Sequence, residues 1–137
     1  MTSDFNIAVH ALVYLSNHCE TLVSSDELAR NICTHPVRVR RVMIKLREAG
    51  MVSTKAGVSG GYLISEDAGS ITLSKVAKSL TQDYIHVTWH NGEVNKDCIE
   101  DSGMKDVMDD IFIQLNNACD DILKNITIED IMKRVAQ

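Results

Sequence analysis

The chain has 137 residues, of which 45% are apolar and 24% charged, with a single proline, a composition typical of one globular domain that excludes a disordered tail. Its formal net charge of −5 disfavours nucleic acid as a partner when only the total is considered. No apolar run approaches the roughly 18 residues of a membrane span, and the N-terminus lacks a signal-peptide pattern. We therefore expect a cytoplasmic protein without a membrane partner.

Apolar residues at helical spacing predict three helices in the first 50 residues. The first covers about 4–19. The second follows Ser24, which has capping-box spacing to Glu27, and ends near Cys33. The third has Pro36 in its first turn, stops at Gly50, and has an apolar stripe of Val39, Val42, Met43 and Leu46. Two short helices joined by a tight turn, the second with arginines outside its apolar stripe, are typical of a helix-turn-helix.

Residues 51–65 predict a β-hairpin, with strand-like segments at 51–55 and 61–65 around a glycine-containing tip. Three helices followed by a hairpin form the winged variant of the motif, whose wing tip can reach the DNA backbone or the minor groove. In this chain the tip includes Ser59 and Gly60. Thr72 then caps a short helix that runs to Leu80. Residues 82–103 show no clear period and are interpreted as a loop.

A long helix is predicted over 104–126. Its apolar residues recur every three to four positions, at Met104, Met108, Ile111, Leu115, Ala118, Cys119, Ile122 and Ile126. This stripe is wider than a surface helix needs, which favours pairing with a second copy of the chain, although burial within its own domain would give the same pattern. A last helix begins at Thr127, with Asp130 at capping-box distance, and runs through Val135.

The predicted fold is therefore mainly α with a small β-hairpin. We expect a winged helix-turn-helix domain at 1–81, a sensor or linker loop at 82–103, and a helical dimerisation region at 104–137. The dimer contacts are expected from the residues Met108, Ile111, Leu115, Cys119 and Ile122.

Charge is unevenly distributed along the chain. Residues 1–64 carry a net charge of +2 and residues 65–137 a net charge of −7. Residues 35–55 include six basic residues and a single acidic one, Glu48, so this short stretch has a net charge of +5. Such a concentration is typical of a polyanion-binding surface, although a solvated helix face would look the same.

Three segments carry a resemblance to a known family. Lys45–Val52, the wing glycines with Gly60–Ile64, and Ile71–Leu73 resemble the signature of the Rrf2 family of bacterial transcription regulators. The similarity covers nearly the whole chain. It implies a homodimer that binds double-stranded DNA at a palindromic operator and pairs through the long helix. Family wings often carry an arginine before the first glycine, whereas Ala56 occupies that position here, beside Lys55.

Residue type and family position together suggest the DNA-binding residues. The first turns of a recognition helix reach base edges or flanking phosphates, so we expect such contacts from His35, Val37, Arg38, Arg40 and Arg41. The expected phosphate contacts are Lys45, Arg47 and Lys55. Ser25, at the start of the second helix, can offer backbone N–H groups to a phosphate.

A sensor in this chain could in principle use a metal or a thiol. Iron-sulfur members of the family carry three cysteines close together before the long helix, whereas this chain has only Cys98 there. His86, His90, Asp97 and Cys98 do not complete a metal-binding spacing, so we expect no metal and no cofactor.

A thiol switch is the alternative. Cys33 precedes the recognition helix, where the helix N-terminus and Arg38 would favour a thiolate, although a small apolar residue closing the second helix is an equal interpretation. Cys19 is a candidate partner, and Cys98 a further candidate thiol. We hypothesise that oxidation of Cys33 shifts the arginine-bearing helix.

These observations favour a dimeric DNA-binding regulator, in the role of a repressor. The alternative is a protein-interaction module that controls an enzyme or another regulator through the acidic C-terminal half. An enzyme is not expected, because the chain has no glycine-rich phosphate loop, no HExxH motif and no GxSxG motif.

Overall fold

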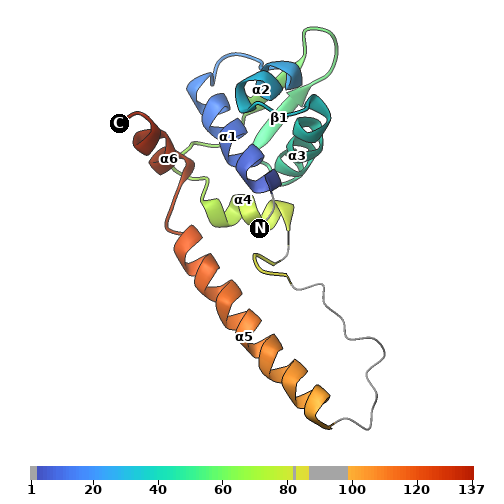
Figure 1. Cartoon of the computed structure of the whole chain (residues 1–137). Helices are drawn as coiled ribbons and strands as arrows, with labels where there is room; N and C mark the ends of the chain where they lie inside the picture. Colours follow the sequence, from blue (N-terminus) through green and yellow to red (C-terminus); the bar gives the residue numbers. More distant parts are fainter. Residues whose placement is uncertain (1–2, 82, 87–98) are drawn as a thin grey trace.

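The computed structural model describes residues 3–81, 83–86 and 99–137. In chain order, its elements are α1 (Ser3–Asn17), α2 (Ser25–Ile32), α3 (Pro36–Glu48), β1 (Val52–Lys55), β2 (Gly61–Ile64), α4 (Leu73–Leu80), α5 (Ile99–Leu123) and α6 (Ile128–Val135). Helices α1–α4 and the hairpin gather at one end, and α5 extends away from them as a long rod (Figure 1). The predicted fold class, mainly helical with one antiparallel hairpin, is confirmed.

The core is built around α1. Its Ala8, Ala11, Leu12 and Leu15 are completely buried and pack with side chains from α2, α3, β1 and α4. Met43 and Leu46 of α3 are also inaccessible to solvent. The apolar stripe predicted for α3 therefore holds this helix against α1 and leaves its opposite face outside. We call residues 3–81 the winged body.

The wing is anchored to the segment before α2. Strands β1 and β2 pair antiparallel, with Val52 opposite Ile64 and Lys55 opposite Gly61. Val23 adds a bridge to Tyr62, with N–H···O distances of 3.0 and 2.8 Å. A Cβ at Gly61 would lie 2.6 Å from the Val23 carbonyl oxygen, so only glycine permits this approach.

The helix boundaries follow local capping rules. Gly50, at φ +79°, follows the C-cap Ala49 and ends α3 as predicted. Thr127 and Asp130 form the full capping box of α6. The box predicted for α2 forms only in part: Ser24 accepts from the Glu27 N–H, but the Glu27 carboxylate instead accepts the Tyr14 hydroxyl at 2.7 Å.

Two predicted boundaries are wrong. Helix α1 ends at Asn17 rather than near residue 19, and α5 runs from Ile99 to Leu123 instead of 104–126. Residues 99–103 are thus helical and not part of the loop, because one glycine at 103 costs a long helix only about 1 kcal/mol. The end of α5 is set by tertiary contact, since the Ile126 carbonyl accepts the Leu73 N–H at 2.8 Å and draws the chain into an extended bridge.

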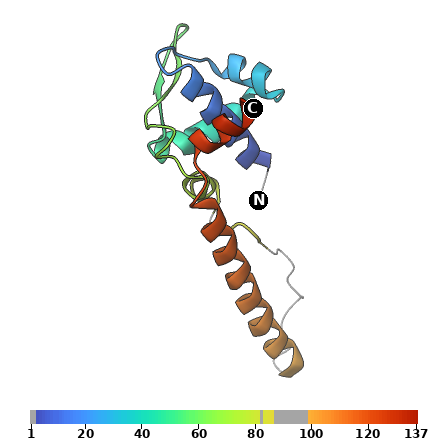
Figure 2. The same cartoon turned by 90° about the vertical axis from the view of Figure 1, so that its left-hand side faces the viewer.

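Helix α6 returns to the winged body. The Ile128 N–H donates to the Ile71 carbonyl at 2.9 Å, and Ile128 itself is fully buried in the core. Figure 2 shows α6 lying across the body while α5 points away from it. The two helices that we grouped at 104–137 therefore have different surroundings. Among the described residues, no helix is long and apolar enough to cross a membrane.

Candidate nucleic-acid interface

Helix α3 presents a mixed basic and aliphatic surface to solvent. We call five of its exposed residues the α3 outer face: Val37, Arg40, Arg41, Ile44 and Arg47; Glu48, the last residue of the helix, is exposed as well. Val37 and Ile44 are 56% and 48% exposed. Thymine methyl groups in the major groove offer such side chains an apolar contact. Sequence reasoning missed Ile44, although its position outside the buried stripe was a visible signal.

His35 has a structural role at the start of α3. Its Nδ1 accepts the Val37 N–H at 3.2 Å and so caps the helix. A neutral ring that accepts through Nδ1 carries its proton on Nε2. His35 is exposed, so this second nitrogen stays available at the end of α3 where we predict DNA contact.

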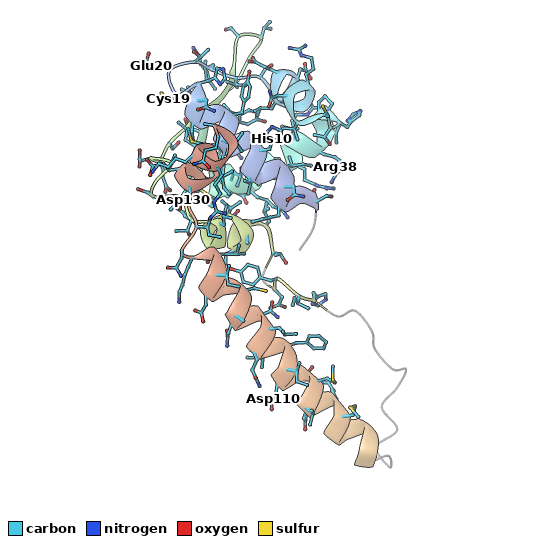
Figure 3. The ribbon with its side chains drawn as sticks, turned by 60° about the vertical axis from the view of Figure 1, so that its left-hand side comes forward. His10, Cys19, Glu20, Arg38, Asp110 and Asp130 are labelled. Carbon is cyan, nitrogen blue, oxygen red and sulfur yellow. The ribbon has the colours of Figure 1, made fainter. Side chains whose placement is uncertain are left out.

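Two of the predicted base-reading arginines share one carboxylate. Arg38 Nη2 lies 3.2 Å from Asp4 Oδ1, and Arg41 Nη2 lies 3.1 and 3.0 Å from the two oxygens of the same group. Arg38 also donates to the Ser3 hydroxyl. Figure 3 shows Arg38 beside the first turn of α1, at the opposite end of that helix from Cys19 and Glu20. Asp4 was not predicted as part of this surface.

The other arginines of α3 face α2 and the wing. Arg40 Nη1 lies 3.3 Å from the Ser25 hydroxyl, which places this predicted phosphate-binding residue directly beside α3. Burial raises the pKa of the Tyr62 hydroxyl, and the positive charges of Arg40 and Arg47 act in the opposite direction. Tyr62, another residue that the sequence did not single out, thus lies within the field of both guanidinium groups.

The predicted lysines differ in surroundings. Lys45 donates to the Leu80 carbonyl at 3.2 Å and is half-buried between α3 and α4, so it is engaged within the fold. Lys55 is exposed at the end of β1, next to the wing tip with Ser59 and Gly60. Val58 at this tip is fully exposed. The wing therefore offers one cation and an apolar tip beside the α3 outer face.

The structure changes the argument for Cys33. This exposed residue caps the C-terminus of α2 with φ 58°, and its thiol donates to the Arg30 carbonyl at 3.7 Å. Arg38, which we expected to favour a Cys33 thiolate, instead donates to Ser3 and Asp4. Cys19 is exposed after α1, Cys119 is half-buried on α5, and Cys98 lies outside the described residues.

Metal-ligating side chains do not gather in the part of the chain that the structure describes, where no three His, Cys, Asp or Glu residues form a potential site. His86 is exposed, with Nδ1 3.8 Å from the Asp83 carboxylate. The other predicted candidates, His90, Asp97 and Cys98, fall outside the described residues.

The family model described as Rrf2, iron-dependent transcriptional regulator, matches residues 1–134. The chain belongs to the Rrf2 family. It is 26% identical over 135 residues to YwnA of Bacillus subtilis, named as an HTH-type transcriptional regulator, covering 98% of both chains. The chain is a transcriptional regulator and not an enzyme.

Solved structures support the same fold for this Rrf2 chain. A transcriptional regulator from Lactobacillus plantarum superimposes with a TM-score of 0.88 at 21% identity, covering 100% of this chain and 92% of the other. CymR, the global cysteine regulator of B. subtilis, gives a TM-score of 0.71 at 18% identity, covering 98% and 96%.

The family description names iron, but the cysteines in the described part of the chain do not fit an iron–sulfur cluster. A cluster needs several thiolates close together, whereas Cys19 follows α1, Cys33 follows α2 and Cys119 lies on α5. The segment before α5 contributes only Cys98. The function proposed below does not use an iron–sulfur cluster.

Proposed function

We propose that this Rrf2 regulator is a homodimeric repressor that places α3 in the major groove of a palindromic operator. The observation that carries this proposal is the α3 outer face, where three arginines and two exposed aliphatic side chains lie on one side of a helix fixed by the core. Arginines can read guanine and aliphatic groups the thymine methyl, while the adjacent wing brings Lys55 toward the flanking backbone.

The apolar seam of α5 supports the homodimer. Met104, Met108, Ile111, Leu115, Ala118 and Ile122 are spaced alternately by four and three residues, which is the heptad spacing of paired helices. Met104, Ile111 and Leu115 are 63%, 41% and 42% exposed, so the chain itself leaves this seam uncovered. Covering it with a second copy removes apolar surface from water, and a two-fold dimer matches a palindrome.

This assembly is consistent with a repressor role. Two α3 helices seated in adjacent major grooves would occupy promoter DNA without any further protein contact. The acidic surface of residues 65–137 then faces away from the phosphates. If that surface instead binds a partner protein, the chain would act as the interaction module considered above.

Cys33 is the proposed signal input. Its exposed thiol lies in the turn between α2 and α3, and among described non-glycine residues only Cys33 has a positive φ. Hypochlorite converts a thiolate to sulfenic acid with release of chloride, and the added oxygen would disturb the thiol contact with Arg30. Such a change in the turn would move α3.

The test is selection of bound DNA from a random pool with reduced and hypochlorite-treated protein. We expect a palindromic sequence, an affinity that falls steeply between low and physiological salt, and weaker binding after oxidation. Cys33→Ser should remove the oxidative response, with Cys19→Ser as the matched control. Failure to select any sequence would refute operator binding, and a Cys33→Ser protein that still responds would refute the switch.

A further inference from the structure

The cluster of Ser3, Asp4, Arg38 and Arg41 lies between the first turn of α1 and the start of α3. The Asp4 side chain is 18% exposed, whereas those of Arg38 and Arg41 are 40% and 60% exposed. Asp4 is one turn before the buried Ile7 and Ala8. The carboxylate is therefore positioned by the core, and it holds the more exposed guanidinium groups.

This arrangement orders the two arginines before any ligand binds. Charge-assisted hydrogen bonds restrict the side-chain rotamers, and donors that are already ordered lose less freedom on binding. Arg38 and Arg41 contact Asp4 through Nη2 alone. Within the described residues, their Nη1 and Nε groups make no hydrogen bond, so each guanidinium keeps donors for a base edge.

The remaining cations of this surface lack such an anchor. In the described part of the chain, Arg40, Arg47 and Lys55 form no ion pair with a carboxylate. Arg40 has only the uncharged Ser25 hydroxyl at 3.3 Å. Side chains of this kind are suited to phosphates, which accept a cation over a range of geometries and carry no sequence information.

Asp4 also places a negative charge next to the DNA-facing surface. A carboxylate there opposes non-specific association with phosphates, because that binding depends on uncompensated positive charge. A correctly formed base contact offsets this cost, whereas a wrong sequence does not. The negative charge of Asp4 and the ordering of the two arginines therefore both increase specificity.

We propose that Asp4 is a specificity-determining residue that orients Arg38 and Arg41 for base recognition while lowering affinity for non-specific DNA. The inference rests on the proposed function, since it requires α3 to enter the major groove. It assigns base reading to Arg38 and Arg41 and phosphate binding to Arg40, Arg47 and Lys55.

The test compares Asp4→Asn with the wild type on the selected operator and on a scrambled duplex of equal length. Asn has nearly the same size but no charge. We expect the ratio of specific to non-specific affinity to fall about tenfold, with tighter non-specific binding and a steeper salt dependence of that binding. Glu20→Gln is the matched control, because it neutralises an exposed acid at the other end of α1 and should leave the ratio unchanged.

A repeated selection from the random pool separates orientation from a simple change in charge. The operator positions that lose their base preference in Asp4→Asn should coincide with those lost in Arg38→Ala or Arg41→Ala. Arg47→Ala should weaken binding evenly across sequences. Asp4→Glu, which keeps the charge, should retain the base preferences in part and provides a second variant if Asp4→Asn does not fold by circular dichroism.

The outcomes are distinct. An unchanged affinity ratio in Asp4→Asn, or lost preferences at positions unrelated to Arg38 and Arg41, would overturn the role of Asp4 while leaving operator binding intact. A wild-type protein that selects no sequence would overturn the proposed function itself, and this inference with it.

Discussion

The winged body and α5 are held in place by opposite kinds of contact. The body is centred on completely buried apolar side chains such as Leu12, Leu46 and Ile71. Along α5 many apolar side chains are exposed, although Leu123 at its end packs against the core, and Asp120 accepts hydrogen bonds from Ser74, Lys78 and Tyr84. The body is thus stabilised by burial within one chain, while this chain leaves much of the apolar surface of α5 uncovered.

Asn116 contacts the segment at 83–86 through hydrogen bonds of its side-chain amide. Its Oδ1 accepts the Ile85 N–H at 2.9 Å, and its Nδ2 donates to the Ile85 carbonyl at 3.1 Å. The amide therefore pairs with the backbone as a neighbouring strand would. Together with Asp120, it fixes the segment at 83–86 and α4 to α5. These hydrogen bonds help to set the direction of α5, and in the dimer that we propose they would help to set the spacing of the two α3 helices.

The largest expected effect comes from replacing a leucine by alanine, which we compare between the winged body and α5. Leu46→Ala leaves a cavity beneath α3 and should lower the free energy of unfolding by about 2–5 kcal/mol. Leu115→Ala, on the 42% exposed seam of α5, should change it little in dilute protein, where a monomer is favoured. Urea unfolding at low concentration measures both. Equal losses would show that α5 is part of the same core.

A charge in the α5 seam tests the uncovered surface directly. Leu115→Glu should weaken self-association about 100-fold, which is roughly 2.7 kcal/mol, because two carboxylates would face each other in an apolar seam. Sedimentation equilibrium gives the association constant, and circular dichroism reports whether the fold is intact. Gln114→Glu is the matched control on the same helix. If Leu115→Glu associates like the wild type, the partner surface lies elsewhere.

The stability of the contact between α4 and α5 should depend on pH. Hydrogen bonds from Lys78, Ser74 and Tyr84 hold the pKa of Asp120 well below its ordinary value. A lowered folded-state pKa means that the contribution to stability is complete above the unfolded carboxyl pKa of about 3.9 and is lost as the pH falls below it. The wild type should therefore be more stable than Asp120→Asn at pH 6, with the difference shrinking toward pH 2.

Thermal unfolding of both proteins across this range measures the difference. Asp121→Asn is the control, since its surface pair with Lys124 at 2.5 Å lies one residue away on the exposed side of α5. A stability gap that is independent of pH would contradict the role of the Asp120 charge.

The sequence correctly predicted features that depend on residues close together along the chain. Pro36 in the first turn of α3, Gly50 after its end and the Thr127–Asp130 box are local rules, and the structure follows them. The contacts that decide the candidate site are distant. Asp4 reaches Arg38 and Arg41 across 34 and 37 positions, and no periodic pattern reports such a meeting.

The same limit explains why the surroundings of two predicted site residues were not foreseen from the sequence. Lys45 stays a predicted phosphate contact, and its ammonium group also donates to the Leu80 carbonyl, 35 positions away along the chain. Arg38 was expected near the Cys33 thiol because the two are close in sequence. On α3 it points to α1 instead, because the packing of the two helices brings a carboxylate within reach.

The smallest predicted effect concerns the cap that holds α6 on the winged body. Thr127 Oγ1 accepts the Asp130 N–H at 3.1 Å, so Thr127→Ala leaves this donor without its partner at the helix start. The expected loss is about 1 kcal/mol, measured by thermal unfolding. Thr21→Ala, in the exposed turn after α1, should change stability far less. The Thr127 cap lies where the chain leaves α5 for the core. If Thr127→Ala and Thr21→Ala change stability equally, the backbone hydrogen bond between Ile71 and Ile128 alone fixes α6.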